Sequence, residues 1–269
     1  MQHMSRAFGE GFVYSGQYSE FRKRRHGNSS KNIRPDKFVV FSQNHDQVGN
    51  RPRGDRLSST ECLEKLKLAG TVVLLSPFIP LIFMGEEYGE TAPFKYFISH
   101  SDKDLIEAVR KGRQREFPSF KNKLSDPQAE NTFLDSRINL SLSEKGNNKL
   151  LFKFYKELII LKKKLTRINI FSNRKIKTGY SDEKRFLYIV MYGKDYNILC
   201  IYSFNESPLN IKIPLTKGIW EKIIDSSSDK WGGSGEKASN IFNCNGDEIG
   251  VSLNSYNALV YLNKNKSGE

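Results

Sequence analysis

The sequence predicts an α/β fold followed by a small antiparallel all-β domain. Two short runs, Phe38–Phe41 and Pro80–Met84, are apolar throughout and are separated by a helical pattern, which is the order of a βαβ unit. Beyond about residue 170 the pattern changes to short β-forming runs separated by turns. With 269 residues and 38% hydrophobic residues, the chain can bury one large core or two modest ones.

The elements of the first part follow in order. The first 30 or so residues are rich in Gly, Tyr, Arg and Ser without a clean period, so we expect an irregular surface segment there. Phe38–Phe41 has the character of a buried parallel strand. In the helix that follows, Ser58 is placed to act as N-cap and Glu61 to complete a capping box, and Pro77 ends the helical pattern.

Later segments complete the pattern. Residues 102–115 and 150–165 have the helical period, and two apolar runs flank a Gly-Lys-Asp turn, which predicts a β-hairpin. The predicted strands are 186–192, 196–202, 210–213, 219–224, 249–253 and 258–262. We therefore divide the chain into residues 1–170 and residues 171–269, and expect the second part to be an antiparallel β-sandwich.

The composition excludes several classes of protein. The net charge is +13, but the basic residues are spread along the chain without a zinc-finger, KH or RRM signature, so we expect no nucleic-acid partner. The longest apolar run, Val72–Met84, is short and interrupted by prolines, so we expect no membrane partner. Three widely spaced cysteines and a polar N-terminus suit a cytoplasmic protein. The sequence shows neither metal-ligand spacing nor a phosphate loop, and we expect no cofactor.

The polar segment after the first strand is the strongest candidate for a functional site. It reads Gln-Asn-His-Asp-Gln-Val-Gly-Asn-Arg, and loops that follow parallel strands carry the sites of such folds. Asp46 can accept hydrogen bonds from two adjacent sugar hydroxyls, and His45 can add one more. From these residues alone, an alternative stays open in which Asp46 caps the next segment and His45 is an ordinary polar residue.

Several stretches, in order, carry a family resemblance. Residues 38–51 resemble the seventh barrel strand of the α-amylase superfamily, and the extended form with Gln47 and Val-Gly-Asn-Arg is similar to the malto-oligosyltrehalose trehalohydrolases. Residues 11–14 and 24–27 resemble the segment that leads to the seventh strand. Residues 81–90 resemble the eighth barrel strand and its loop, and residues 104–113 resemble the helical insert that follows it. The resemblance runs from residue 5 to about residue 135 and is vaguer beyond.

The resemblance implies a (β/α)8 TIM barrel, of which residues 1–170 would be the C-terminal portion, with the last two strands, the helical insert and the last barrel helix. It also implies retaining hydrolysis of the α-1,4 bond next to the terminal trehalose of malto-oligosyltrehalose. An Asp nucleophile and a Glu acid/base perform such a reaction, and a third carboxylate, matching Asp46, stabilises the transition state. The residues expected to contact the substrate beside Asp46 are His45, Gln47, Val48, Gly49, Asn50, Arg51, Glu86 and Tyr88.

The loop after the second strand offers weaker candidates. Glu86 and Glu87 are adjacent, but in this family the acid and the nucleophile follow earlier strands, so we expect Glu86 either to shape the rim of the site or to be solvated. Tyr88 is able to stack on a sugar ring, with a core or rim role as the alternative. For Trp231 we expect packing rather than carbohydrate stacking.

Only two barrel strands are visible, whereas such a barrel needs about 250 residues or more. The strands with the nucleophile and the general acid would lie upstream of Met1. We therefore expect the chain to be inactive alone, and a separately encoded N-terminal half to be one candidate partner. Two alternative functions stay open. The chain could be a relative of glycogen-branching enzymes, which analysis of the reaction products tests. It could also be a non-catalytic carbohydrate-binding remnant, which the neighbouring genes test.

Overall fold

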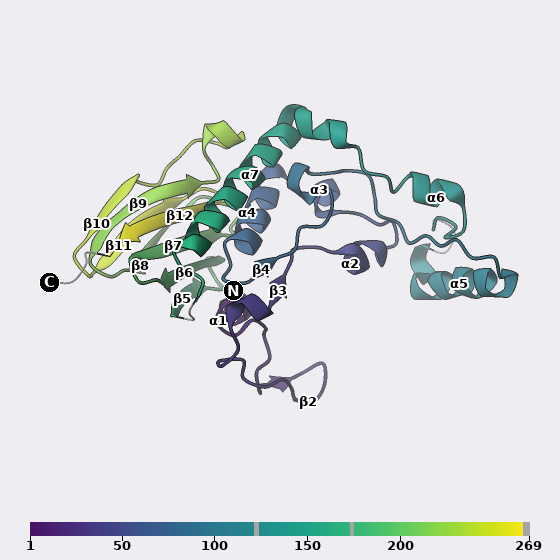
Figure 1. The fold of residues 1–269 in the computed structure, drawn as a ribbon, viewed down its shortest axis with the longest axis horizontal. Helices are drawn as coiled ribbons and strands as arrows, with labels where there is room; N and C mark the ends of the chain where they lie inside the picture. Colours follow the sequence, from purple (N-terminus) through teal and green to yellow (C-terminus); the bar gives the residue numbers. More distant parts are fainter. Residues whose placement is uncertain (121–123, 173–174, 266–269) are drawn as a thin grey trace. The chain divides into compact units, whose positions relative to one another are not determined.

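The structure is a computed structural model that describes residues 1–120, 124–172 and 175–265 (Figure 1). The chain folds into two compact units. The first comprises residues 1–40, 67–81 and 153–269, and the second comprises residues 41–66 and 82–152. Within the described residues, no helix is both long enough and apolar enough to cross a bilayer.

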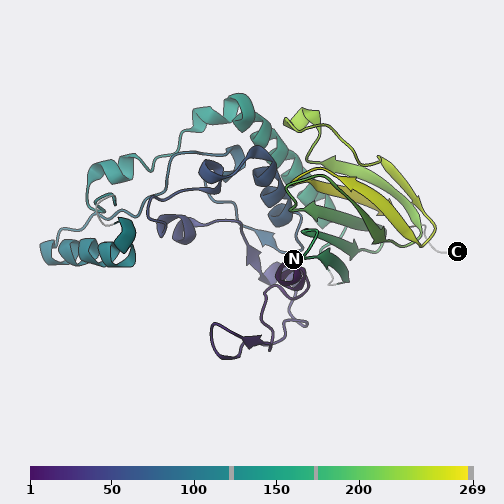
Figure 2. The ribbon, with the colours of Figure 1, turned by 180° about the vertical axis from the view of Figure 1, so that it is seen from behind.

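Two β-sheets form the body of the first unit. The larger sheet is antiparallel throughout, with the strand order β10-β9-β12-β7-β6-β5. Figure 1 labels its strands, and Figure 2 shows the same sheet from behind. The bounds are β5 (Ile176–Ser181), β6 (Phe186–Tyr192), β7 (Tyr196–Ser203), β9 (Gly218–Asp225), β10 (Ile241–Cys244) and β12 (Ala258–Lys264). A second sheet pairs β8 (Leu209–Pro214) with β11 (Glu248–Leu253). The predicted hairpin and the four predicted later strands are confirmed, whereas β5 and β10 were not anticipated.

The core of this unit lies between the two sheets. Alternate residues of β6 and β7, such as Val190 and Ile201, are buried together with Ile213 and Val251 from the smaller sheet. The C-terminal part therefore contains a six-stranded antiparallel sheet that shares a core with a second, two-stranded sheet, and these two sheets are called the β-sandwich below. The other face of β6 and β7 is also buried, as Ile198 and the residues alternating with it show. This explains why Phe186–Tyr192 and Ile198–Tyr202 are apolar at every position, whereas β8 alternates between exposed and buried residues.

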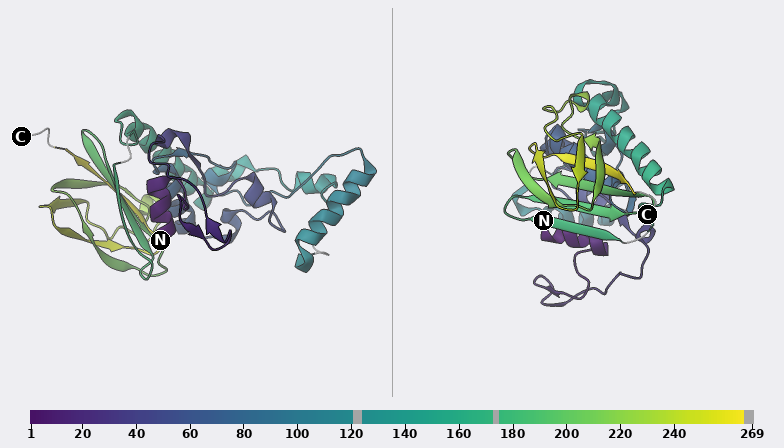
Figure 3. Two further views of the ribbon diagram at one scale, coloured as in Figure 1. Left: turned by 90° about the horizontal axis from the view of Figure 1, so that it is seen from below. Right: turned by 90° about the vertical axis from the view of Figure 1, so that its left-hand side faces the viewer.

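Helices cover that second face. Helix α1 (Gln2–Glu10) packs against β5 and β6, as Figure 3 shows in both views, and Phe8 stacks on Tyr202 with ring centroids 6.1 Å apart. The expectation of an irregular segment is therefore wrong for residues 2–10. Phe8 is the single fully buried residue of this helix, so its apolar stripe is too thin to stand out in the sequence. Gly11 ends the helix in the left-handed region, with φ of 83°.

The predicted βαβ unit is present in the first unit and is short. β3 (Val39–Val40) pairs in parallel with β4 (Ile79–Pro80), and the expected strand Pro80–Met84 is wrong beyond Pro80. Val39 is 55% exposed and Ile79 is 47% exposed, so the pair is not buried as a central parallel strand would be. Among the described residues no third strand extends this pair, and its ladder spans two residue pairs.

The remaining elements are helices and short turns. The α-helices are α2 (His45–Gly49), α3 (Leu57–Thr60), α4 (Leu63–Leu74), α5 (Lys103–Glu116), α6 (Glu130–Leu134) and α7 (Gly146–Arg167). The 3-10 turns are η1 (Pro35–Lys37), η2 (Glu86–Tyr88), η3 (Pro118–Phe120), η4 (Leu140–Glu144) and η5 (Asp229–Trp231), and β1 (Tyr18–Ser19) pairs with β2 (Arg24–Arg25). The helices predicted at 102–115 and 150–165 are confirmed as α5 and α7.

The predicted capping box is wrong. Arg56 is the N-cap of α3, Ser58 lies inside that helix, and its hydroxyl donates to the carbonyl oxygen of Glu90. Glu61 ends α3 and pairs instead with Lys65, with an Oε2–Nζ distance of 2.7 Å. The long helix starts later, at Leu63, and its end at Leu74 agrees with the stop expected from Pro77.

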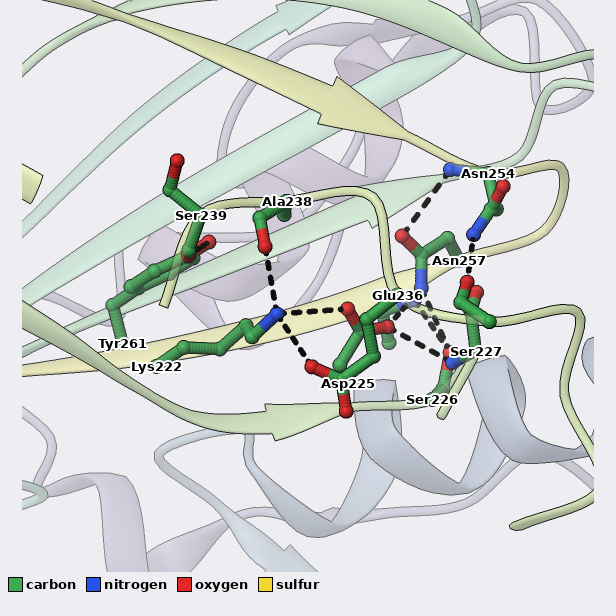
Figure 4. Close-up of polar contacts among 12 residues, drawn as sticks. Lys222, Asp225, Ser226, Ser227, Glu236, Ala238, Ser239, Asn254, Asn257 and Tyr261 are labelled. Carbon is green, nitrogen blue, oxygen red and sulfur yellow. Dashed lines mark hydrogen bonds and ion pairs between the residues drawn. The ribbon is translucent and has the colours of Figure 1, made fainter. Parts of the chain in front are cut away.

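Buried polar contacts hold a loop of the β-sandwich in place (Figure 4). The Lys222 ammonium contacts Asp225 Oδ2 at 3.3 Å, Glu236 Oε2 at 2.7 Å and the Ala238 carbonyl at 2.8 Å, which matches its three donors. Asn257 donates to the other oxygen of Asp225 at 3.1 Å. The charges of Lys222 and Asp225 are thus buried within a connected network, which a protein interior tolerates.

Trp231 belongs to the same loop and confirms the packing prediction. It is 7% exposed, and its ring meets Phe154 edge-on with centroids 5.4 Å apart. The buried ammonium of Lys67 on α4 donates to the carbonyls of Ser226 and Trp231 at 2.6 and 3.2 Å. Trp231 therefore links helices to the sandwich within the first unit and offers little of its ring to a ligand.

Candidate functional site

The candidate site lies at the start of α2, in the second unit. Asn44 is the N-cap of this helix, and its Oδ1 accepts a hydrogen bond of 2.8 Å from the Gln47 amide. The alternative in which Asp46 caps this segment is therefore wrong. Asp46 is in the first turn instead, with a side chain that is 74% exposed, and His45 beside it is 70% exposed.

Asp46 and His45 form a small polar pair. His45 Nε2 lies 3.3 Å from Asp46 Oδ1, and no other polar partner of the Asp46 carboxylate occurs within the described residues. The carboxylate keeps a free oxygen for a ligand, and the imidazole can donate or accept at its side. This arrangement suits recognition of adjacent hydroxyl groups. It offers one exposed carboxylate, whereas glycoside hydrolysis uses a pair.

A layer of buried polar groups supports this segment. Gln43 is 4% exposed and its Oε1 accepts from the Leu57 amide at 3.1 Å. Glu86 is 7% exposed, and its two oxygens accept from the Ser42 hydroxyl at 2.9 Å and from the Phe83 amide at 3.3 Å. Glu86 thus joins the segment after β3 to the segment after β4, rather than facing solvent.

Tyr88 is also buried. It is 1% exposed, and its hydroxyl donates to Glu90 Oε2 at 3.0 Å. Burial, followed by the hydrogen bond to Glu90, raises the pKa of the Tyr88 phenol. The ring is part of the packing of this loop, and it is not placed on a surface where a sugar could stack.

Sequence reasoning missed two charged residues in this layer. Glu90 is 1% exposed, and its Oε1 accepts from the amides of Thr91 and Ala92 at 2.8 Å each. Arg56 is 1% exposed, donates to the carbonyls of Ala92 and Met84 at 2.7 Å, and lies over the Phe83 ring, and burial lowers its pKa. One signal in the sequence could have pointed to this turn, namely the glycine that precedes it. Gly85 has a φ of 86°, which favours glycine.

The rest of the motif forms the end of α2 and the loop after it. Val48 and Gly49 are buried, whereas Gln47, Asn50 and Arg51 are exposed at the surface. Arg51 lies 3.7 Å from Asp55. The structure therefore brings the exposed members of the motif to one short helix and its following loop. Among the described residues, no group of three or more His, Cys, Asp or Glu side chains could hold a metal ion.

Comparisons with known proteins agree with the resemblance. No family model matches the chain. It is similar to a malto-oligosyltrehalose trehalohydrolase from Saccharolobus solfataricus, with 43% identity over 201 residues that cover 75% of this chain and 33% of the relative. It is also similar to a malto-oligosyltrehalose trehalohydrolase from Rhizobium sp., with 34% identity over 79% of this chain and 36% of the relative. The chain thus spans about one third of the length of these curated relatives.

A solved structure extends the likeness to 97% of the chain. The crystal structure of a candidate α-amylase from Salmonella typhimurium matches with a TM-score of 0.80 and 29% identity. The match covers 97% of this chain and 41% of that protein. The arrangement of helices followed by an antiparallel sheet is therefore that of part of an α-amylase-type structure.

Proposed function

We propose, because this chain is homologous to the C-terminal part of the malto-oligosyltrehalose trehalohydrolases, that it forms part of a retaining α-glycosidase. The reaction would cleave the α-1,4 bond next to the terminal trehalose of malto-oligosyltrehalose and release trehalose. The observation that carries the proposal is the position of Asp46. Its carboxylate is exposed at the start of α2, two residues after the capping Asn44, within a motif that resembles this family.

In the proposed mechanism Asp46 acts on the sugar whose bond is broken. Its carboxylate accepts hydrogen bonds from two ring hydroxyls, and those bonds strengthen as positive charge develops at the anomeric carbon. His45, 3.3 Å away, would contact the same sugar. The covalent step needs a nucleophile and an acid/base about 5 Å apart. We assign both to polypeptide beyond this chain, in the region of the relatives that it does not cover.

The other motif residues receive different roles. Gln47, Asn50 and Arg51 are exposed and would border the glucan, whereas Val48 and Gly49 are buried and would contribute backbone and packing. Glu86 and Tyr88 are 7% and 1% exposed, so we propose that they hold the loop after β4 beneath the site and do not touch the substrate.

The exposed strands support a partner polypeptide. Val39 is 55%, Ile79 is 47% and Leu81 is 39% exposed, although apolar residues in parallel strands are normally covered on both faces. We propose that further parallel strands pair with β3 and β4 and bring the nucleophile and the acid/base to Asp46. These strands could belong to the same longer polypeptide or to a separately encoded half.

The test uses a completed enzyme in which the N-terminal two thirds of the Saccharolobus solfataricus relative is fused upstream of this chain. In that enzyme Asp46→Asn should lower kcat on malto-oligosyltrehalose by about 100-fold or more, equivalent to about 3 kcal/mol. The loss follows because the amide keeps the size of the carboxylate but not its charge.

The matched control is Asp135→Asn, which removes an exposed carboxylate that pairs with Lys95 at 2.7 Å. It should leave kcat unchanged. Near-normal turnover of a correctly folded Asp46→Asn enzyme would remove the assigned role. Branched glucan without free trehalose as the product would favour a branching enzyme instead.

A further inference from the structure

Arg113 on α5 has an unusually enclosed position. Helix α5 has no buried residue, yet the Arg113 side chain is only 11% exposed. Its guanidinium lies over two aromatic rings, 4.7 Å from the centroid of Tyr96 and 4.9 Å from that of Phe117. A planar cation held against two rings keeps a defined orientation, which a lysine ammonium could not.

The guanidinium binds the end of the helix that carries Asp46. Nη2 donates to the carbonyl of Gly49 at 3.1 Å, and Nη1 donates to Oδ1 of Asn50 at 3.2 Å. Gly49 is the last residue of α2, and Asn50 is its C-cap. Helix ends leave carbonyls without intrahelical partners, and a cation there is electrostatically favourable. Glu116, at 2.8 Å from Nη1, balances the charge from the same helix.

The loop after α2 is held from another direction by Phe94. Its amide donates to the Gly54 carbonyl at 2.9 Å, and its ring lies where a side chain at Gly49 would make ordinary contact, at 3.6 Å. Phe94 in turn packs edge-on against Phe83, with centroids 5.4 Å apart. The C-terminal end of α2 is therefore contacted by Arg113 and by Phe94.

A helix as short as α2 depends on such contacts. It contains five residues, far fewer than a helix needs to be stable in isolation. Its N-terminus is fixed by Asn44, and its C-terminus by Arg113. We infer that Arg113 is a positioning residue, which fixes the direction in which α2 presents Asp46. The catalytic consequence rests on the proposed function, whereas the effect on α2 does not.

The first test is hydrogen exchange on the 269-residue chain. The amides of Asn50 and Arg51 bond to the carbonyls of Asp46 and Val48 at 3.0 Å each, so they report the end of α2. Arg113→Lys and Arg113→Met should make both amides exchange about 10-fold faster or more, as loss of hydrogen bonds from a charged donor implies. Unchanged protection of both amides in both variants would overturn the inference.

The control is Arg110→Lys, one turn earlier on the same helix. Arg110 binds Asp126 and Glu107 instead of α2, through contacts of 2.5 to 2.9 Å. It should leave exchange at Asn50 and Arg51 unchanged. Equal acceleration in this control would show a general loosening of α5 and would also overturn the inference.

The second test measures the completed enzyme. Arg113→Lys should lower kcat about 10-fold and leave KM within about 3-fold, because a misdirected Asp46 loses interactions that belong to the transition state. If Asp46→Asn has no effect on turnover, the proposed function fails and the exchange result stands by itself. If Asp46→Asn is impaired but Arg113→Lys is not, the positioning role fails.

Discussion

Two regions of the first unit share a sequence pattern and differ in structure. Residues 198–202 of β7 and the runs that contain β3 and β4, residues 38–41 and 78–84, are apolar throughout. In β7 every residue from 197 to 203 is buried, and Ile201 has no exposed surface. In the parallel pair Ile79 is 47% exposed and Val39 is 55% exposed. The same pattern therefore produced a closed core in one region and an open strand pair in the other.

The difference shows what a continuous apolar run encodes. Such a run indicates that both faces of a strand are covered, but it does not indicate which part of a polypeptide covers them. For β7 the covering elements are present: the smaller sheet on one face and helix packing, including Phe8 against Tyr202, on the other. For β3 and β4 no described residues supply further strands. The proposed catalytic residue, Asp46, follows the open pair along the chain, and under the proposed function the strands that cover this pair also carry the nucleophile and the acid/base.

The largest effect expected in the chain itself compares two isoleucines. Ile201→Ala should lower the free energy of unfolding by about 2 to 5 kcal/mol, because it leaves a cavity in a closed core. Ile79→Ala should lower it by about 1 kcal/mol or less, because half of that side chain is already solvated. Urea unfolding of the 269-residue chain and of both variants measures the difference.

The comparison becomes sharper in the completed enzyme. There Ile79→Ala should approach the cost of Ile201→Ala, since the added strands would bury Ile79. Equal costs of the two substitutions in the chain alone would contradict the distinction between an open and a closed region.

A smaller effect on stability is expected from Lys162 on α7, whose side chain is largely enclosed by its neighbours in the first unit. Its ammonium donates to the carbonyls of Ser76 at 2.5 Å and Phe78 at 3.0 Å, just before β4. Burial lowers the pKa of Lys162 from 10.5 to about 8. Between these values the unfolded chain binds more protons than the folded chain, so the free energy of unfolding should rise with pH.

We expect Lys162 to contribute a rise of about 1 to 3 kcal/mol between pH 8 and pH 10. Urea unfolding of the chain and of Lys162→Met at a series of pH values measures it, and the substitution should remove that part of the rise. Lys163→Met, at the exposed neighbouring position, is the control and should leave the pH dependence unchanged. A rise that is the same in all three proteins would place the titrating group elsewhere.

The sequence predicted regular elements better than it predicted the contacts that support the site. The strands β6, β7 and β12 follow from their apolar runs, and α5 follows from its period. Helix α1 was not predicted because Phe8 is its one buried residue, and a single apolar position gives no helical period. The division at residue 170 stays a prediction, although residues 153–167 of α7 group with the sandwich.

At the site, the motif predicted a polar loop, whereas His45–Gly49 form the short helix α2. The residues that support this helix were not predicted. The sequence offered Asp46 as a possible cap of this segment, whereas the backbone geometry gives that role to Asn44. The burial of Tyr88 and the contacts of Arg56 and Arg113 depend on residues that lie between two and more than sixty positions away. No local period records such contacts, so they require the folded structure.

The most direct test of the account measures trehalose release from malto-oligosyltrehalose by the 269-residue chain and by the completed enzyme. The account predicts no detectable release by the chain alone, because Asp46 supplies binding and transition-state stabilisation without the covalent step. It predicts release by the completed enzyme that depends on Asp46. Release by the chain alone, at a rate comparable to the full-length Saccharolobus solfataricus relative, would contradict the account.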